Sequence, residues 1–163
     1  MTHTLIISEK PQAALRIADA LAESKIKKVG KKAYWLEFTR SNKKIVVVPA
    51  VGHLFVLNTI RGEGWNYPEF DVEWIPTFNR KGSEFTKKYY NNIKKLVKGS
   101  DDFIIATDYD TEGEVIGFNI LRFLCNRTDA KRMKFSTLTK ADLIEAYENF
   151  MSQFFLNLTY LPF

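Results

Sequence analysis

Four carboxylates lie within seven consecutive positions of this 163-residue chain. The stretch "DYDTEGE", residues 108–114, holds Asp108, Asp110, Glu112 and Glu114 directly after an apolar run. Ionised carboxylates this close repel one another, and a divalent cation is the simplest group that holds several together. The spacing favours an open Mg²⁺ site suited to phosphoryl transfer. Acidic loops before helices are common, so from spacing alone a plain solvated loop stays equally open.

The rest of the chain is basic, with a net charge of +5, which is compatible with a polyanionic partner such as nucleic acid. A bare acidic loop would repel such a partner. A bound metal would bridge the carboxylates to phosphate oxygens, and this would explain why a basic chain concentrates negative charge at one place.

The elements that must position these residues alternate between strands and helices. Buried strands are predicted at Thr4–Ser8 and in "DDFIIAT", and a shorter one in "RMKFS". Helices are predicted from Pro11 to Ser24, over Ser83–Lys98, from about Glu112 to Asn126, and after a capping pair of Thr139 and Asp142. Ala33–Phe38 and Ile45–Val48 flank a hairpin turn, and residues 58–82 have no clear periodicity and predict a long irregular excursion. This order predicts an α/β layer with a mainly parallel central sheet.

In such sheets ligands gather beyond the carboxyl ends of the strands. Glu9 follows the first strand, and Asp108 and Asp110 follow a later one, so these side chains converge if the two strands are neighbours. A spacing of two points Asp108 and Asp110 the same way. Glu112 falls at the helix start, where negative charge is favoured.

Five segments occur in an order that resembles a known family. They are "ISEKP" (residues 7–11), "VGHL" (51–54), "YPEFDVEWIP" (67–76), "DYDTEGE" (108–114) and "FSTLT" (135–139). Together they resemble the N-terminal Toprim domain of type IA DNA topoisomerases, most closely the archaeal members, over about residues 4–149. The acidic motif is shared by Toprim proteins broadly, whereas "GHL" and "YPEFDVEWIP" are more specific to the topoisomerases. The resemblance implies a Rossmann-like Toprim domain with a β-hairpin excursion.

The resemblance also implies roles for individual residues. Glu9 would be the general acid for the leaving 3′ oxygen and would approach the metal. Lys10 would contact DNA and stabilise charge at the scissile phosphate, and His53 would contact DNA. The implied Mg²⁺ ligands are Glu9, Asp108, Asp110 and Glu112. Glu114 is expected to be no ligand but a charge interacting with the helix dipole.

The family's nucleophilic tyrosine lies in a later domain, beyond 163 residues, and Tyr109 is not expected to replace it. We therefore expect a Toprim domain at residues 1–149 that is inactive alone on its single-stranded DNA segment and that has the topoisomerase gate domains as a partner. Residues 150–163 form an uncharged apolar tail that departs from the family pattern. Two alternatives stay open, a stand-alone metal-dependent nuclease and a noncatalytic DNA-binding module.

Other features concern location and partners. One cysteine, Cys125, permits no internal disulfide and fits a reducing compartment. The early apolar run is too short for a signal peptide, and the apolar tail is too short for a membrane helix. We expect a cytoplasmic, nucleoid-associated protein with no membrane partner and no small-molecule cofactor besides the metal. The lysines of the 83–98 helix are expected to face solvent, and contact with DNA is the less favoured alternative.

Overall fold

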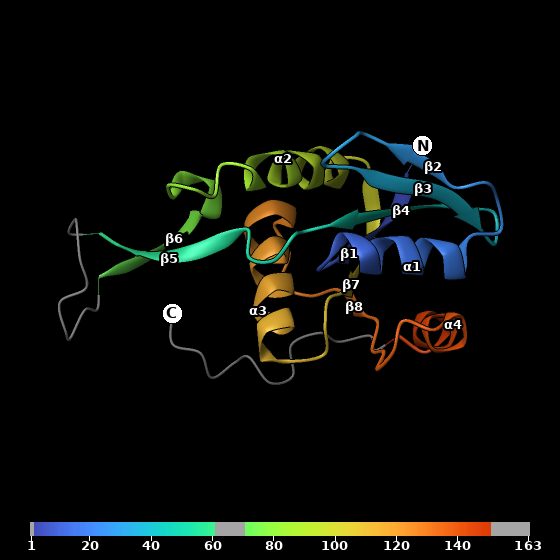
Figure 1. Cartoon of the computed structure of the whole chain (residues 1–163). Coiled ribbons are helices and arrows are strands. Elements are labelled where there is room, and N and C mark those ends of the chain that lie inside the picture. The colour runs from blue at the N-terminus through green and yellow to red at the C-terminus, as the bar shows by residue number, and fades with distance from the viewer. Residues whose placement is uncertain (1, 61–70, 151–163) are drawn as a thin grey trace.

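The core of the fold is a six-stranded mixed sheet with strand order β2-β3-β4-β1-β7-β8 (Figure 1). The computed structural model describes residues 2–60 and 71–150. The strands are β1 (His3–Ser8), β2 (Lys27–Val29), β3 (Trp35–Arg40), β4 (Lys43–Pro49), β7 (Ser100–Ala106) and β8 (Lys131–Arg132). β4, β1, β7 and β8 are parallel, whereas β2 and β3 run antiparallel at one end. The predicted α/β class with a mainly parallel sheet is confirmed.

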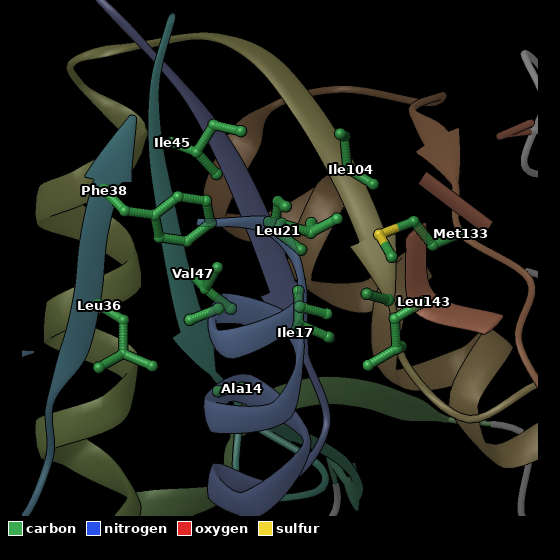
Figure 2. Packing of buried hydrophobic residues seen from close by; sticks show 14 of the residues in the cluster. Ala14, Ile17, Leu21, Leu36, Phe38, Ile45, Val47, Ile104, Met133 and Leu143 are labelled. Atoms are coloured by element: carbon green, nitrogen blue, oxygen red, sulfur yellow. The ribbon is translucent and has the colours of Figure 1, made fainter. Parts of the chain in front are cut away.

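Helices cover both faces of the sheet (Figure 1). The helices α1 (Pro11–Leu21) and α4 (Lys140–Glu148) pack on one face, and α2 (Thr86–Val97) and α3 (Thr111–Ile120) pack on the other. All six residues of β1 are buried because the strand is central and covered twice. Leu5 and Ile7 join the α2–α3 core, and Ile6 joins the α1–α4 core. Figure 2 shows Ile17 and Leu21 of α1 packed near Val47, Ile104 and Leu143.

Several short sequence features lie in the local structures that they predict. Pro11 is the first residue of α1, and the Thr139 side chain accepts a hydrogen bond from Asp142 N at the start of α4. The β3–β4 hairpin turns at Ser41 and Asn42, whose φ values of 48° and 60° match a tight two-residue turn. The predicted hairpin is therefore confirmed.

The helix predicted from about Glu112 to Asn126 is confirmed in extent but changes type, and a predicted strand is much shorter than its pattern indicates. α3 stops at Ile120 and continues as a π-helical turn, η2 (Leu121–Cys125), which Asn126 ends in a left-handed conformation with φ 52°. Of the predicted "RMKFS" strand, residues 132–136, only Arg132 lies in a strand, the two-residue β8 (Lys131–Arg132). Beyond it Met133 and Phe135 turn their side chains into the α1–α4 core, which takes the chain away from the edge of the sheet.

The predicted excursion at residues 58–82 contains regular structure that its pattern did not indicate, at 58–59 and at 72–79. β5 (Phe55–Thr59) and β6 (Val72–Pro76) form a separate two-stranded antiparallel sheet, followed by the 3₁₀ turn η1 (Thr77–Asn79). Both strands are largely half-exposed, so their hydrophobic alternation is weak. The first four residues of "YPEFDVEWIP" (67–70) and residues 151–163 of the predicted tail lie outside the described residues. Within the described ranges, no helix is long and apolar enough to cross a bilayer.

Candidate functional site

The predicted site residues gather at the carboxyl ends of the parallel strands. β1 lies between β4 and β7, with Ser8 paired to both Pro49 and Ala106. Glu9 and Asp108 follow these neighbouring strand ends, one and two residues further along the chain. The convergence of Glu9 and Asp108 therefore depends on the adjacency of β1 and β7, which are separated by about 90 residues in sequence.

Lys10 joins the two strand ends directly. Its Nζ atom lies 2.8 Å from Asp108 Oδ2 and 3.2 Å from Glu9 Oε1. The hydrogen bond to Asp108, and then that to Glu9, raises the pKa of Lys10 well above its ordinary value, so its ammonium stays charged. Glu9 is buried at 7% exposure, whereas Lys10 is exposed. An exposed cation thus contacts a buried carboxylate at the carboxyl edge of the sheet.

The chain after β4 turns sharply around Glu9. Val51 N donates to the Glu9 carbonyl at 2.8 Å, and Val51 itself adopts a left-handed conformation with φ 60°. A β-branched residue in this region costs roughly 1–3 kcal/mol, and such strain concentrates at functional sites. Gly52 follows with φ 79°, so the "VGHL" segment bends towards the acidic loop.

The bend brings His53 to the helix that carries Glu112. His53 Nε2 lies 3.3 Å from Glu112 Oε1, and Thr77 Oγ1 donates to the His53 carbonyl at 2.7 Å. His53 was expected to contact DNA and Glu112 to bind metal. Their contact places both residues in one surface region, although neither role is tested by this geometry.

Asp110 has a structural task in addition to its predicted one. Its Oδ1 accepts a hydrogen bond of 2.7 Å from Gly113 N, which caps the first turn of α3. Gly113 packs so closely that an added Cβ would lie 2.0 Å from the Asp108 carbonyl oxygen. The glycine of "DYDTEGE" is therefore required by the close approach of α3 to its own loop.

Arg132 is a residue of the site that sequence reasoning missed. It is 2% exposed, and its Nε lies 2.9 Å from Glu114 Oε1. Its Nη1 donates to the Thr107 carbonyl at 2.8 Å and its Nη2 to the Asp108 carbonyl at 2.8 Å. The buried guanidinium is thus hydrogen-bonded to the backbone of the acidic loop on its inner side. Glu114 forms the ion pair with Arg132, which is a more specific interaction than the predicted one with the helix dipole.

The "FSTLT" segment lies beside the acidic loop. A hollow of about 380 Å³ is lined by Asp108, Tyr109 and residues 135–138. Asp142 Oδ2 accepts hydrogen bonds from Ser136 N and Thr137 N, which orders this segment at the start of α4. The segments 7–11, 51–54, 108–114 and 135–139 therefore meet at this edge of the sheet.

The donor chemistry of these residues fits a hard divalent cation, because every expected ligand is a carboxylate. In the described ranges, however, no three His, Cys, Asp or Glu side chains are gathered as a metal-binding group. Glu9 and Asp108 contact Lys10, Asp110 caps α3, and Glu112 contacts His53. The Lys10 ammonium already lies between two of the carboxylates. The Mg²⁺ set of Glu9, Asp108, Asp110 and Glu112 stays a prediction.

The fold is an α/β sheet, and the ends of its parallel strands carry a Glu-Lys pair and an Asp-x-Asp-x-Glu loop. This combination is typical of one class of protein, and comparison with known families identifies the same class. The Toprim domain model matches residues 4–138, and the chain belongs to this family.

Its relatives include DNA topoisomerase 1 of Methanocaldococcus jannaschii, 47% identical over 146 residues, and DNA topoisomerase 1 of Pyrococcus furiosus, 48% identical over 149 residues. DNA topoisomerase 3 of Staphylococcus haemolyticus is 32% identical over 151 residues. Each alignment covers 89% of this chain, but only 19%, 14% and 20% of the relative. The chain thus spans about a fifth or less of these relatives.

A solved topoisomerase structure resembles this chain. The full-length topoisomerase I of Thermotoga maritima matches with a TM-score of 0.59 and 25% identity, covering 91% of this chain and 21% of that one. The predicted resemblance to the Toprim domain of DNA topoisomerases is confirmed.

Proposed function

We propose that this chain is the Mg²⁺-binding Toprim part of a type IA DNA topoisomerase, which cleaves and rejoins a single-stranded DNA segment when the gate domains complete it. The observation that carries the proposal is the contact of Lys10 with both Glu9 and Asp108 at the ends of β1 and β7. The relatives are DNA topoisomerases, and the matched region is a small part of each. A protein with this task would be located with the nucleoid in the cytoplasm.

The residues of the chain divide the proposed chemistry. Glu9, buried beside Lys10, would hold the proton that the leaving 3′ oxygen takes up. Lys10 is exposed and would exchange Asp108 for a phosphate oxygen, where its charge stabilises the developing negative charge. Asp108, Asp110 and Glu112, with Glu9, would hold Mg²⁺, which when bound neutralises phosphate charge. His53 would contact the DNA strand from the neighbouring loop.

No nucleophilic tyrosine is assigned in this chain, so the proposal predicts no strand cleavage by the chain alone. Labelled single-stranded DNA, incubated with Mg²⁺ and the 163-residue chain, should stay intact. Addition of the gate domains of a type IA relative should produce covalent protein–DNA adducts in the wild type and none with Asp108→Asn. Asp19→Asn, an exposed change on α1, is the matched control and should behave as wild type.

The opposite outcomes are equally informative. Cleavage by the chain alone that needs Mg²⁺ and Asp108, without an adduct, would replace the proposal with a stand-alone nuclease. DNA binding without turnover even when the gate domains are present would replace it with a noncatalytic binding module.

A further inference from the structure

The net positive charge of the chain comes from two segments. Residues 25–32 and 80–98 contain twelve basic residues and one acidic residue, Glu84. The remaining sequence has twelve basic and eighteen acidic residues, so it is net negative. The net charge of +5 therefore arises entirely from these two segments. Such an asymmetry is the electrostatic footprint of a polyanion-binding surface.

The fold places these segments side by side. Residues 25–32 include β2 and the loop into β3, and residues 80–98 include α2. Tyr89 of α2 donates from its hydroxyl to the Lys32 carbonyl at 3.1 Å. Lys28 lies over the Tyr34 ring at 4.0 Å, and Lys95 lies over the Trp35 ring at 5.3 Å. Trp35 packs in the α2–α3 core and Tyr34 in the α1–α4 core, so Lys95 lies on the α2 side of the sheet and Lys28 on the opposite side. The Tyr89–Lys32 contact joins α2 and the loop into β3 into one surface.

The centre of this surface is hollowed. Lys31, Lys32 and Lys88, with the amide side chains of Asn91 and Asn92, line a depression of about 540 Å³. All three lysines are exposed, and within the described residues none of them has a carboxylate partner. The Asn92 amide nitrogen is shielded from solvent and makes no hydrogen bond in that part of the chain. Exposed cations without a carboxylate partner suit phosphate oxygens.

The hollow opens on the same edge of the sheet as the acidic site. β3 pairs antiparallel with β4, so the loop that enters β3 lies at the carboxyl end of β4, beside the end of β1. Tyr34 Oη donates to the Pro11 carbonyl at 3.2 Å, which links that loop to the residue after Lys10. A nucleic-acid strand at Lys10 would reach the hollow by continuing along this edge.

We propose that Lys31, Lys32 and Lys88 form a second nucleic-acid site, which binds the phosphate backbone of a strand beside the acidic site. The proposal rests on the proposed DNA function for its occupant. For Lys88 it favours DNA contact, the alternative to a purely solvent-facing role of the lysines in the 83–98 helix. The binding is independent of sequence and of divalent metal, because it consists of phosphate contacts made by lysines.

The test measures binding of the full chain to a fluorescent 20-nucleotide single strand by anisotropy, in EDTA, between 50 and 300 mM KCl. The triple variant Lys31→Gln, Lys32→Gln, Lys88→Gln should bind roughly 10- to 100-fold more weakly at about 0.1 M salt, with a salt slope smaller by about 2. The control variant Arg16→Gln, Lys43→Gln, Lys140→Gln makes the same charge change at exposed positions outside the surface and should bind within about twofold of wild type.

Equal weakening in the two triple variants would overturn the proposal, since net charge alone would then explain the binding. Unchanged binding in both would also overturn it and would leave the proposed topoisomerase function standing. A wild-type chain that binds no DNA at any salt concentration would overturn the second site. The proposed function is judged separately, by adduct formation with Asp108→Asn and the gate domains.

Discussion

The Nε atom of Arg132 lies 2.9 Å from Oε1 of Glu114, and this ion pair joins the edge strand β8 to the helix that follows the acidic loop. Arg132 is nearly fully buried and also donates to the carbonyls of Thr107 and Asp108. The loop that carries the predicted metal ligands is therefore held by a cation on its inner side, whereas Lys10 contacts it on its outer side.

Removal of the inner cation should destabilise the fold. Arg132→Met leaves Glu114 and two loop carbonyls without their donor, so the free energy of unfolding should fall by about 3–5 kcal/mol. Urea denaturation followed by circular dichroism measures it. Arg16→Met, an exposed change on α1, should cost less than about 0.5 kcal/mol. A loss below about 1 kcal/mol for Arg132→Met would show that the buried pair does not hold the loop.

Gly113 should tolerate no side chain. An alanine Cβ would lie 2.0 Å from the Asp108 carbonyl, so Gly113→Ala must displace the acidic loop and should cost about 3 kcal/mol or more. Gly82→Ala separates this clash from backbone strain, because Gly82 has φ 85° but nothing within 4 Å of its Cβ position. The control should lose only about 1–2 kcal/mol. Equal losses in both variants, measured by the same denaturation, would contradict the steric explanation.

Lys10 should compete with a metal ion for the carboxylates. Its ammonium contacts both Glu9 and Asp108, so Lys10→Gln should bind Mn²⁺ several-fold more tightly than wild type, as measured by electron paramagnetic resonance. Lys134→Gln removes a nearby exposed charge that contacts the Tyr109 ring instead, and its effect should be smaller. Weaker Mn²⁺ binding by Lys10→Gln would mean that the lysine organises the carboxylates rather than competes for them.

His3 should make stability depend on pH. Burial, and then the charge of Lys44, lower the pKa of His3 below 6.5. The unfolded chain therefore binds a proton more readily than the folded one, so this contribution is complete above about pH 6.5 and is lost as pH falls through that value.

The comparison with His3→Gln isolates this effect. Ser100 Oγ donates to the Leu96 carbonyl, so the His3 ring nitrogen 3.0 Å away must be the donor to Ser100, and glutamine can keep that donor. Urea unfolding at pH 5.0 and 7.5 should show a larger acid loss for wild type than for His3→Gln. Equal losses would assign the pH dependence to other groups.

Cys125 should react slowly in the folded protein. Burial raises the pKa of its thiol to about 12, and the side chain is 9% exposed. Because the thiolate is the reactive form, reaction with a disulfide reagent at about pH 8 should be at least ~100-fold slower in the folded chain than in urea. It is the sole cysteine of the sequence, so the absorbance signal has a single source. Similar rates in both conditions would show that the π-helical turn opens readily.

Much of the fold could be predicted from local pattern. Apolar runs, helical spacing and end signals such as Pro11 and Thr139 indicate β1, α1, β7 and α4, because burial and capping act over a few residues. β5 and β6 were missed because each strand is half-exposed and their pairing, Thr59 with Val72, spans a chain excursion. The length of β8 was overestimated because packing of Met133 in the core overrides strand propensity.

For the candidate site, the sequence by itself determined which chemistry is present: a Glu-Lys pair after one buried strand and an acidic loop after another. Only the tertiary structure decided which groups meet. Lys10 and Asp108 are 98 residues apart, and Arg132 reaches Glu114 from a different strand. The order of the strands sets these contacts, and that order is chosen by the packing of whole faces. Residue type and spacing are local properties, whereas a salt bridge depends on which strand ends become neighbours.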